Sequence, residues 1–143
     1  MHYRTMELSD YQSIIKLWTQ SEGLQLRDAD SIEGITKYLN RNPGLSFVCE
    51  VDGHLAGTIM CGHDGKRGYI QHLAVLKGYR KQGIGEKLMS HCLEALRQEG
   101  ISKSHIHVLD NNELAKAFWV KVGWKKRTDL QVYSYINGDE KSA

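Results

Sequence analysis

Hydrophobic residues recur every three or four positions in two segments near the N-terminus, residues 9–23 and 28–44. This spacing gathers their side chains on one face of a helix. Ser9 is a good N-cap for the first segment, and each segment ends in glycine, as helices often do. The pattern therefore predicts two successive amphipathic helices. The glycines are Gly23 and Gly44, and the residues of the two apolar faces are Ile14, Leu17, Trp18, Ile32, Ile35 and Leu39.

The next three hydrophobic runs are short and rich in β-forming residues. They span residues 46–51, 55–62 and 69–76, with Asp52–Gly53 as a turn signal after the first and the polar segment 63–68 before the third. Strands joined by such short turns pair antiparallel. This part of the sequence predicts a three-stranded meander.

Helical spacing returns between Gly83 and Gly100, where apolar residues recur every fourth position and predict a helix of about four to five turns. Residues 102–109 follow as a predicted strand. Because a strand, a helix and a strand in this order form a right-handed crossover, the strands at 69–76 and 102–109 should lie parallel.

The last segments predict one short helix at 112–123 and two strands at 124–127 and 130–136, before a polar tail at 137–143 that should fray. The predicted order is ααβββαβαββ. We therefore expect an α+β fold in one domain, residues 1–143, with a mixed, largely antiparallel sheet flanked by helices.

The composition is that of one ordinary globular domain. With 143 residues the chain can bury one sizeable core, and 19 Lys and Arg against 17 Asp and Glu leave a net charge of only +2. No stretch approaches the roughly 20 apolar residues that span a bilayer, and the first residues lack the apolar core of a signal peptide. The three cysteines lack CxxC spacing, which favours reduced thiols. We expect a cytoplasmic protein that binds neither membrane nor nucleic acid.

A segment rich in glycine and cations, "VLKGYRKQGIGEKL", joins the third predicted strand to the long helix. The first N–H groups of a helix lack internal partners and carry partial positive charge, so this entry, with Arg80 and Lys81, predicts a phosphate site. It is not a Walker A loop, because Ile84 and Gly85 stand where Lys and Ser or Thr are needed. It is not a dinucleotide fingerprint, because Leu88 takes the third glycine position.

Two motifs point to a family. "LAVLKGYRKQGIGEKLM" fits the signature Q/R-x-x-G-x-G/A at Arg80–Gly85, and "NELAKAFWVKVGW" fits N-x-x-A-x-x-F-Y-x-x-x-G-F from Asn112 to Trp124, except that Trp119 takes the tyrosine position. Together they resemble the motifs of the GNAT superfamily of N-acetyltransferases. The order of predicted elements is also similar over essentially the whole chain, and the resemblance implies an acyltransferase that uses acetyl-CoA.

The resemblance further implies which residues hold acetyl-CoA. Loop amides would bind the pyrophosphate, the end of the third predicted strand would pair with the pantetheine arm, and an asparagine would reach the arm from the other side. Lys77 replaces a common proline and Gly78 a common acid, and neither change removes a donor. The implied residues are Arg80, Lys81, Gln82, Gly83, Ile84 and Gly85 for pyrophosphate, Leu73, Ala74 and Val75 for the arm, and Asn112 opposite.

Acetyl transfer to an amine needs a group that takes the proton of the nitrogen. In relatives this is often a glutamate, with a tyrosine as the acid for the thiolate, and Trp119 cannot give up a proton. His107 takes the strand position of that glutamate, and His72 faces similarly from the neighbouring strand, so both are candidate bases. A metal site on His105, His107 and His72 is an alternative, because i and i+2 strand positions share a face, but no carboxylate or cysteine lies at a recognisable ligand spacing and we expect no metal.

The acceptor should be held by the loop between the first two predicted helices, residues 23–30. Arg27 is a candidate partner for a carboxylate and Asp28 or Asp30 for an amine, although solvated charges are the commoner explanation of such loop residues. Tyr133 and Tyr135 are alternative acids or sheet-packing aromatics.

The sequence thus predicts an N-acetyltransferase that moves acetyl from acetyl-CoA directly to a primary amine of a small molecule or peptide. The first alternative is an inactive acyl-CoA-binding module of the same fold. The second is a nucleic-acid binder that uses Arg80, Lys81, Lys125, Lys126 and Arg127, although no recognition motif accompanies them. The sequence leaves the oligomeric state open, a homodimer included.

Overall fold

The structure is a computed structural model that describes residues 1–22 and 24–140. The predicted helix end at Gly23 and the last three residues of the predicted tail lie outside the described residues. The chain divides into two compact units, Met1–His107 and Val108–Ala143, and each is considered by itself. No helix in the described ranges is long and apolar enough to cross a membrane.

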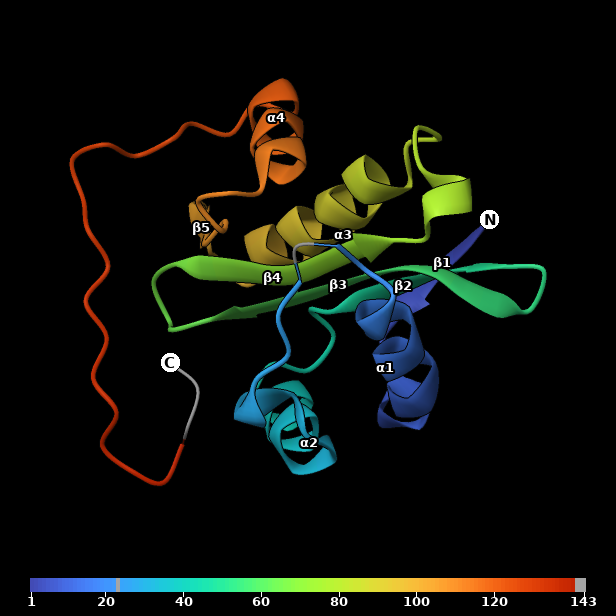
Figure 1. Ribbon diagram of the computed structural model, residues 1–143, viewed down its shortest axis with the longest axis horizontal. Helices are drawn as coiled ribbons and strands as arrows, with labels where there is room; N and C mark the ends of the chain where they lie inside the picture. The colour runs from blue at the N-terminus through green and yellow to red at the C-terminus, as the bar shows by residue number, and fades with distance from the viewer. Residues whose placement is uncertain (23, 141–143) are drawn as a thin grey trace. The chain divides into compact units, whose positions relative to one another are not determined.

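A five-stranded sheet forms the centre of the first unit, in the order β1-β2-β3-β4-β5 (Figure 1). The first four strands pair antiparallel, and β5 pairs parallel with β4. The predicted meander and the predicted parallel crossover strand are thereby confirmed. The five strands span His2–Thr5, Phe47–Val51, His54–His63, Gly68–Val75 and Ser104–Ile106.

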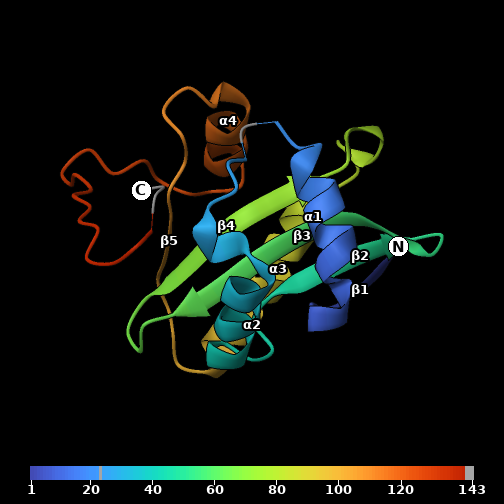
Figure 2. The same cartoon turned by 60° about the horizontal axis from the view of Figure 1, so that its bottom comes forward.

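Helices cover both faces of this sheet. α1 (Tyr11–Thr19) and α2 (Ile32–Arg41) lie on one face, and α3 (Ile84–Gln98) lies on the other (Figure 1, Figure 2). A short 3-10 turn precedes each helix, so the N-cap of α1 is Asp10 rather than the predicted Ser9. The three turns are η1 (Leu8–Asp10), η2 (Asp28–Asp30) and η3 (Lys77–Tyr79).

The core has one layer on each face of the sheet. On the side of α1 and α2, Trp18 and Ile35 are only 1% exposed and belong to one buried cluster. On the other side α3 lies so close to β3 that a Cβ on Gly57 would stand 2.9 Å from the Ile84 side chain. Fully burying an aliphatic side chain stabilises the fold by about 1.5–3 kcal/mol, so both layers hold the strands in place. Ile32, predicted on the apolar face of α2, is exposed.

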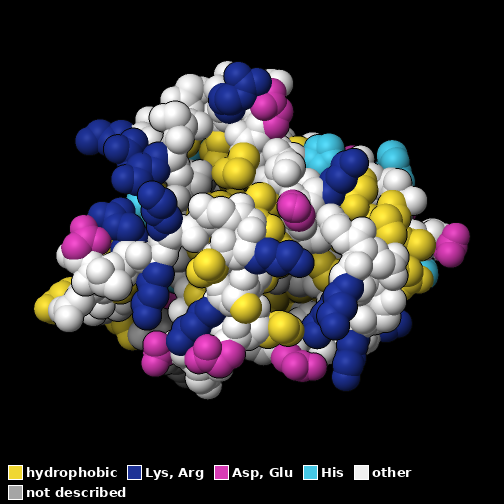
Figure 3. Space-filling view, turned by 90° about the horizontal axis from the view of Figure 1, so that it is seen from above, with side chains coloured by type: hydrophobic (Ala, Val, Ile, Leu, Met, Phe, Trp, Pro, Cys, Tyr) yellow, Lys and Arg dark blue, Asp and Glu magenta, His cyan; other side chains and the backbone are white. Residues whose placement is uncertain are grey.

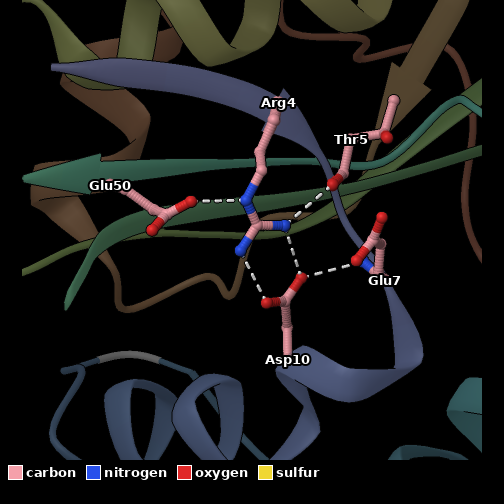
Figure 4. A network of polar contacts seen from close by, with 5 residues as sticks. All are labelled: Arg4, Thr5, Glu7, Asp10 and Glu50. Atoms are coloured by element: carbon pink, nitrogen blue, oxygen red, sulfur yellow. Dashed lines mark hydrogen bonds and ion pairs between the residues drawn. The ribbon is translucent and has the colours of Figure 1, made fainter. Parts of the chain in front are cut away.

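β1 is a strand that the hydrophobic pattern did not predict. Its four residues show no clear alternation, and charged contacts hold it in place (Figure 4). The Arg4 guanidinium bonds Glu50 on β2 and both carboxylate oxygens of Asp10, at 2.9 and 2.7 Å. Because both partners are carboxylates, the pKa of Arg4 is raised, and the pKa of Asp10 is lowered although burial acts to raise it.

The second unit contains α4 (Glu113–Lys121), as predicted. Asn112 caps it, with its side-chain oxygen accepting from Ala115 N at 3.0 Å. Trp119 is buried and packs edge-on against the rings of Phe118 and Trp124, at 5.0 and 4.9 Å between centroids. Three aromatic rings therefore form the apolar centre of this unit.

The two predicted C-terminal strands are wrong. Residues 124–127 and 130–136 form no strand within the described part of the chain. Their alternating pattern is real, but apolar side chains there are largely exposed, with Val132 at 71% and Tyr135 at 91%. A strand needs a neighbour for its backbone bonds, and alternation alone does not supply one. The observed order therefore begins with a strand and ends at α4, while the predicted class, a mixed sheet flanked by helices, is confirmed.

Candidate active site

The glycine loop begins where β4 ends at Val75 and passes through η3 before α3 starts at Ile84. Two of its residues have a positive backbone φ, Lys81 at 65° and Gly83 at 83°. These angles turn the chain sharply, and Arg80 Nε secures the turn by donating to the Val75 carbonyl at 3.1 Å.

The N-terminus of α3 carries amide donors that the helix itself does not use. Its first bond runs from Lys87 N to the Gly83 carbonyl at 3.0 Å, so the amides of Ile84 and Gly85 have no carbonyl one turn back. A Cβ on Gly83 would meet nothing within 4 Å. The glycine therefore serves the positive φ and leaves open space beside these amides, which suits an anion.

The positive charge around this loop is local. Lys81 is exposed and Arg80 is half-buried. Figure 3 shows Lys and Arg side chains in a group at the left of the view and, elsewhere, among acidic, hydrophobic and neutral groups. An anion at the start of α3 would therefore meet backbone amides and a few cations.

β4 has an open edge immediately before the loop. β5 pairs with β4 only at Gly68, Tyr69 and Ile70, although β4 continues to Val75. From Gln71 onward, no described strand pairs with the edge of β4 that faces away from β3. Backbone groups on such an edge can bond an extended ligand as another strand would. The predicted pantetheine residues Leu73, Ala74 and Val75 all lie on this stretch.

A bulge interrupts β4 beside that edge. Gln71 pairs with Met60 and Ala74 with Thr58, so the two residues between them on β4 stand opposite one residue of β3. One of the two, His72, has a φ of 53°, which is uncommon for a residue other than glycine. Backbone strain of this kind clusters at functional sites.

The side chain of His72 is held from two sides. Its Nε2 lies 2.8 Å from Asp30 Oδ1, and its ring meets the Trp18 ring edge-on at 4.6 Å between centroids. The backbone is held as well, because Thr58 Oγ1 donates to the His72 carbonyl at 3.4 Å and accepts from Trp18 Nε1 at 2.8 Å. The side chains of His72 and Asp30 are 15% and 9% exposed, so the pair is nearly buried.

Asp30 is an ionised partner for this histidine. Burial acts to raise the pKa of its carboxyl group, but hydrogen bonds from His72 and from the Arg27 amide, at 2.9 Å, outweigh burial and lower the pKa. Tyr11 also donates from its hydroxyl to the Asp30 carbonyl at 3.0 Å. Asp30 was predicted as a partner for the acceptor amine, and its carboxylate is instead engaged within the protein.

Among the described residues, the other two predicted histidines, His105 and His107, do not contact the His72–Asp30 pair. His107 is exposed and follows β5, which ends at Ile106 rather than at the predicted 109. His105 contacts the Tyr69 ring, and no described histidines, cysteines and acids form a group of three that could hold a metal. Asn112 and Trp119 lie in the second unit, where the Asn112 side-chain oxygen caps α4.

The contributions of Trp18 and Thr58 were missed by sequence reasoning. Trp18 was predicted only as a core residue and Thr58 not at all, because each lies far along the chain from His72. The sequence did mark Asp30, which stands in a short polar segment ahead of a capped helix. It did not indicate that His72 is the partner of Asp30.

Comparison with known proteins decides the family. Residues 11–124 match the model of the acetyltransferase (GNAT) family. The chain belongs to this family. It is 30% identical over 125 residues to a curated acetyltransferase of Pectobacterium atrosepticum, covering 87% of this chain and 88% of that one. Acetyl-CoA is therefore its co-substrate.

Solved structures share the fold of this GNAT chain. An aminoglycoside 6'-N-acetyltransferase of Acinetobacter haemolyticus superimposes with a TM-score of 0.79 at 12% identity, covering 96% of this chain and 100% of that one. The PaiA N-acetyltransferase of Thermoplasma acidophilum, in complex with coenzyme A, gives 0.76 at 20% identity, covering 87% and 89%. The open β4 edge and the free amides of α3 suit acetyl-CoA, because they offer backbone bonds to its arm and donors to its pyrophosphate.

Proposed function

We propose that this GNAT enzyme transfers acetyl from acetyl-CoA directly to a primary amine of a small molecule or peptide. The observation that carries the proposal is the open edge of β4, which runs from the anion loop at one end to the His72 bulge at the other. Val75 lies three residue steps from His72, about 10 Å along an extended chain. An arm lying along this edge, with its phosphates at the loop, carries its thioester towards the bulge.

The amides of residues 81–85, with Arg80, hold the pyrophosphate, and the backbone of residues 73–75 holds the arm. Asn112, the donor that the family resemblance implies, keeps its side-chain NH₂ available, because its oxygen accepts from Ala115 N in the α4 cap. Two solved neighbours of the same fold are named as N-acetyltransferases, which supports an amine as acceptor. All three cysteines are free and buried, which supports a reducing, cytoplasmic location.

The test is turnover of acetyl-CoA with spermidine, lysine, kanamycin and a short peptide with a free N-terminal alanine. Release of the CoA thiol that depends on one of these amines, with mass spectrometry showing one acetyl group on its nitrogen, is the expected result. Binding of acetyl-CoA without turnover of any amine would instead identify an inactive acyl-CoA-binding module.

A further inference from the structure

The contact between His72 and Asp30 joins the middle of the sheet to the segment before α2, 42 residues away in the sequence. We propose that His72 takes the proton of the acceptor amine and that Asp30 is the positioning residue that orients it. This inference rests on the acetyl transfer proposed above and names the base of that reaction.

The backbone of His72 is fixed in a conformation that few residues adopt. A φ of 53° costs an ordinary residue about 1–2 kcal/mol, so surrounding contacts must hold it there. The hydrogen bond from Thr58 to its carbonyl provides one such contact, and Trp18 in turn donates to Thr58. These hydrogen bonds from Thr58 and Trp18 hold the strained backbone and so fix the position of the His72 side chain.

The contact with Asp30 selects the tautomer. An ionised carboxylate can only accept hydrogen bonds, so the hydrogen of a neutral His72 ring lies on Nε2, which points to Asp30 Oδ1. Its other nitrogen, Nδ1, then carries a free lone pair and can accept a proton. Asp30 is itself fixed through Oδ2 by the Arg27 amide, so the ring cannot easily turn.

The proposed step starts from a neutral amine. The nitrogen lone pair attacks the thioester carbonyl carbon, the N–C bond forms, and the C–S bond breaks with its electron pair leaving on sulfur. His72 Nδ1 takes the proton released by the nitrogen and passes it to the thiolate. The products are the acetamide and CoA with a free thiol, and His72 ends neutral as it began.

Within the described part of the chain, the His72 ring contacts one charged group. Asp30 faces the ring from η2, while Trp18 and Thr58, from α1 and β3, are uncharged. Arg27 and Tyr11 reach Asp30 rather than the ring. His107, the other candidate base, is exposed and has no such orienting contact in the part of the chain that the structure describes.

The first test replaces His72 by asparagine. Asparagine tolerates positive φ better than most residues, so His72→Asn removes the imidazole with little change to the bulge. We expect kcat for the best amine of the panel to fall by roughly 10², the usual contribution of a general base, with acetyl-CoA affinity unchanged by calorimetry. His107→Asn tests the other candidate base, and a loss of rate in that variant rather than in His72→Asn would overturn the role of His72.

The second test asks whether Asp30 positions His72 for catalysis or only stabilises the fold. The kcat/KM of the unmodified protein should rise with pH through two limbs, a lower one from the base and a higher one from the acceptor amine. Asp30→Asn removes the charge that favours imidazolium but retains an acceptor, so the lower limb should move to lower pH. If Asp30 were only structural, the variant would be less stable and the limb would stay in place.

The third test is chemical rescue. His72→Gly suits the positive φ and leaves space beside Trp18, so added imidazole should restore part of the rate to this variant and none to His107→Gly. A folded His72→Asn protein with the unmodified rate and the same lower limb would overturn the role of His72 while leaving the acetyl transfer intact. Absence of turnover by the unmodified protein with every amine would overturn the transfer and, with it, this role.

Discussion

The glycine loop follows β4 and is proposed to bind the acetyl donor, whereas the His72–Asp30 pair lies at the middle of β4 and is proposed to act on the acceptor. The two regions are built differently. The loop is continuous in sequence, from Val75 to Gly85, and its donors are backbone amides. The pair draws on α1, β3, β4 and η2 and acts through side chains. Binding of the donor should therefore tolerate most side-chain changes, whereas chemistry on the acceptor should be sensitive to residues far from His72.

The largest effect is expected in the loop, at Gly83, where a side chain would be added. Gly83→Val places a branched side chain at a φ of 83° and in the open space beside the first amides of α3. Strain and lost ligand space together should weaken acetyl-CoA binding about 100-fold, roughly 2.7 kcal/mol. Isothermal calorimetry with acetyl-CoA measures the change.

Two controls separate strain from lost space. Gly65→Val carries similar strain, at a φ of 96° in the turn between β3 and β4, and should lower stability without changing acetyl-CoA affinity. Gly78→Val adds the same side chain within η3, where a Cβ meets nothing within 4 Å and φ is not positive. This variant should change neither stability nor acetyl-CoA affinity. Unchanged affinity in a folded Gly83→Val protein would remove the loop from the donor site.

A smaller effect is expected on the acceptor side from Thr58, which does not touch the His72 ring. Thr58→Val keeps the shape of a fully buried side chain but leaves Trp18 Nε1 without its acceptor at 2.8 Å. An unsatisfied buried donor costs about 1–3 kcal/mol, and a less rigid bulge should lower kcat about tenfold. Chemical denaturation and steady-state kinetics measure the two effects.

Thr36→Val is the matched control, because its hydroxyl donates to the Ile32 carbonyl within α2. It should leave both stability and kcat close to those of the unmodified protein. If Thr58→Val lowers stability but leaves kcat unchanged, the bulge does not need its side-chain support for catalysis.

The loop is continuous in sequence and the His72 site is assembled from distant segments, and this difference explains what the sequence could predict. The loop was predicted because its glycines and cations are consecutive and spell a family motif. The His72 site was predicted only in part, because a bulge shifts the period-2 pattern of β4 and nothing in the sequence links His72 to Asp30. The strands predicted at 124–127 and 130–136 failed for a related reason, since strand pairing is a property of two segments and the pattern describes one.

Asp30 also makes the stability of the folded protein depend on acidic pH, an effect that the backbone amides of the loop do not have. Because the pKa of Asp30 is lowered in the folded protein, its contribution to stability is present above the unfolded value of about 3.9 and is lost as pH falls through the folded value. We expect the free energy of unfolding to fall below about pH 4, and less steeply in Asp30→Asn. Urea titrations at several pH values measure the slopes. Equal slopes would show that the carboxylate is not held in its charged form by folding.

The smallest effect is expected at Trp119, where the resemblance to relatives leads one to expect a tyrosine acid. If His72 passes its proton to the thiolate, no separate acid is needed, and an ordinary thiol pKa of about 8.5 already makes the thiolate a fair leaving group. Trp119→Tyr should therefore leave kcat within about tenfold of its unmodified value, since one added proton donor contributes little where another acts. Trp124→Tyr, the same change on the neighbouring ring, controls for loss of aromatic packing. A gain well above tenfold in Trp119→Tyr alone would show that departure of the thiolate lacks a donor and that His72 does not supply one.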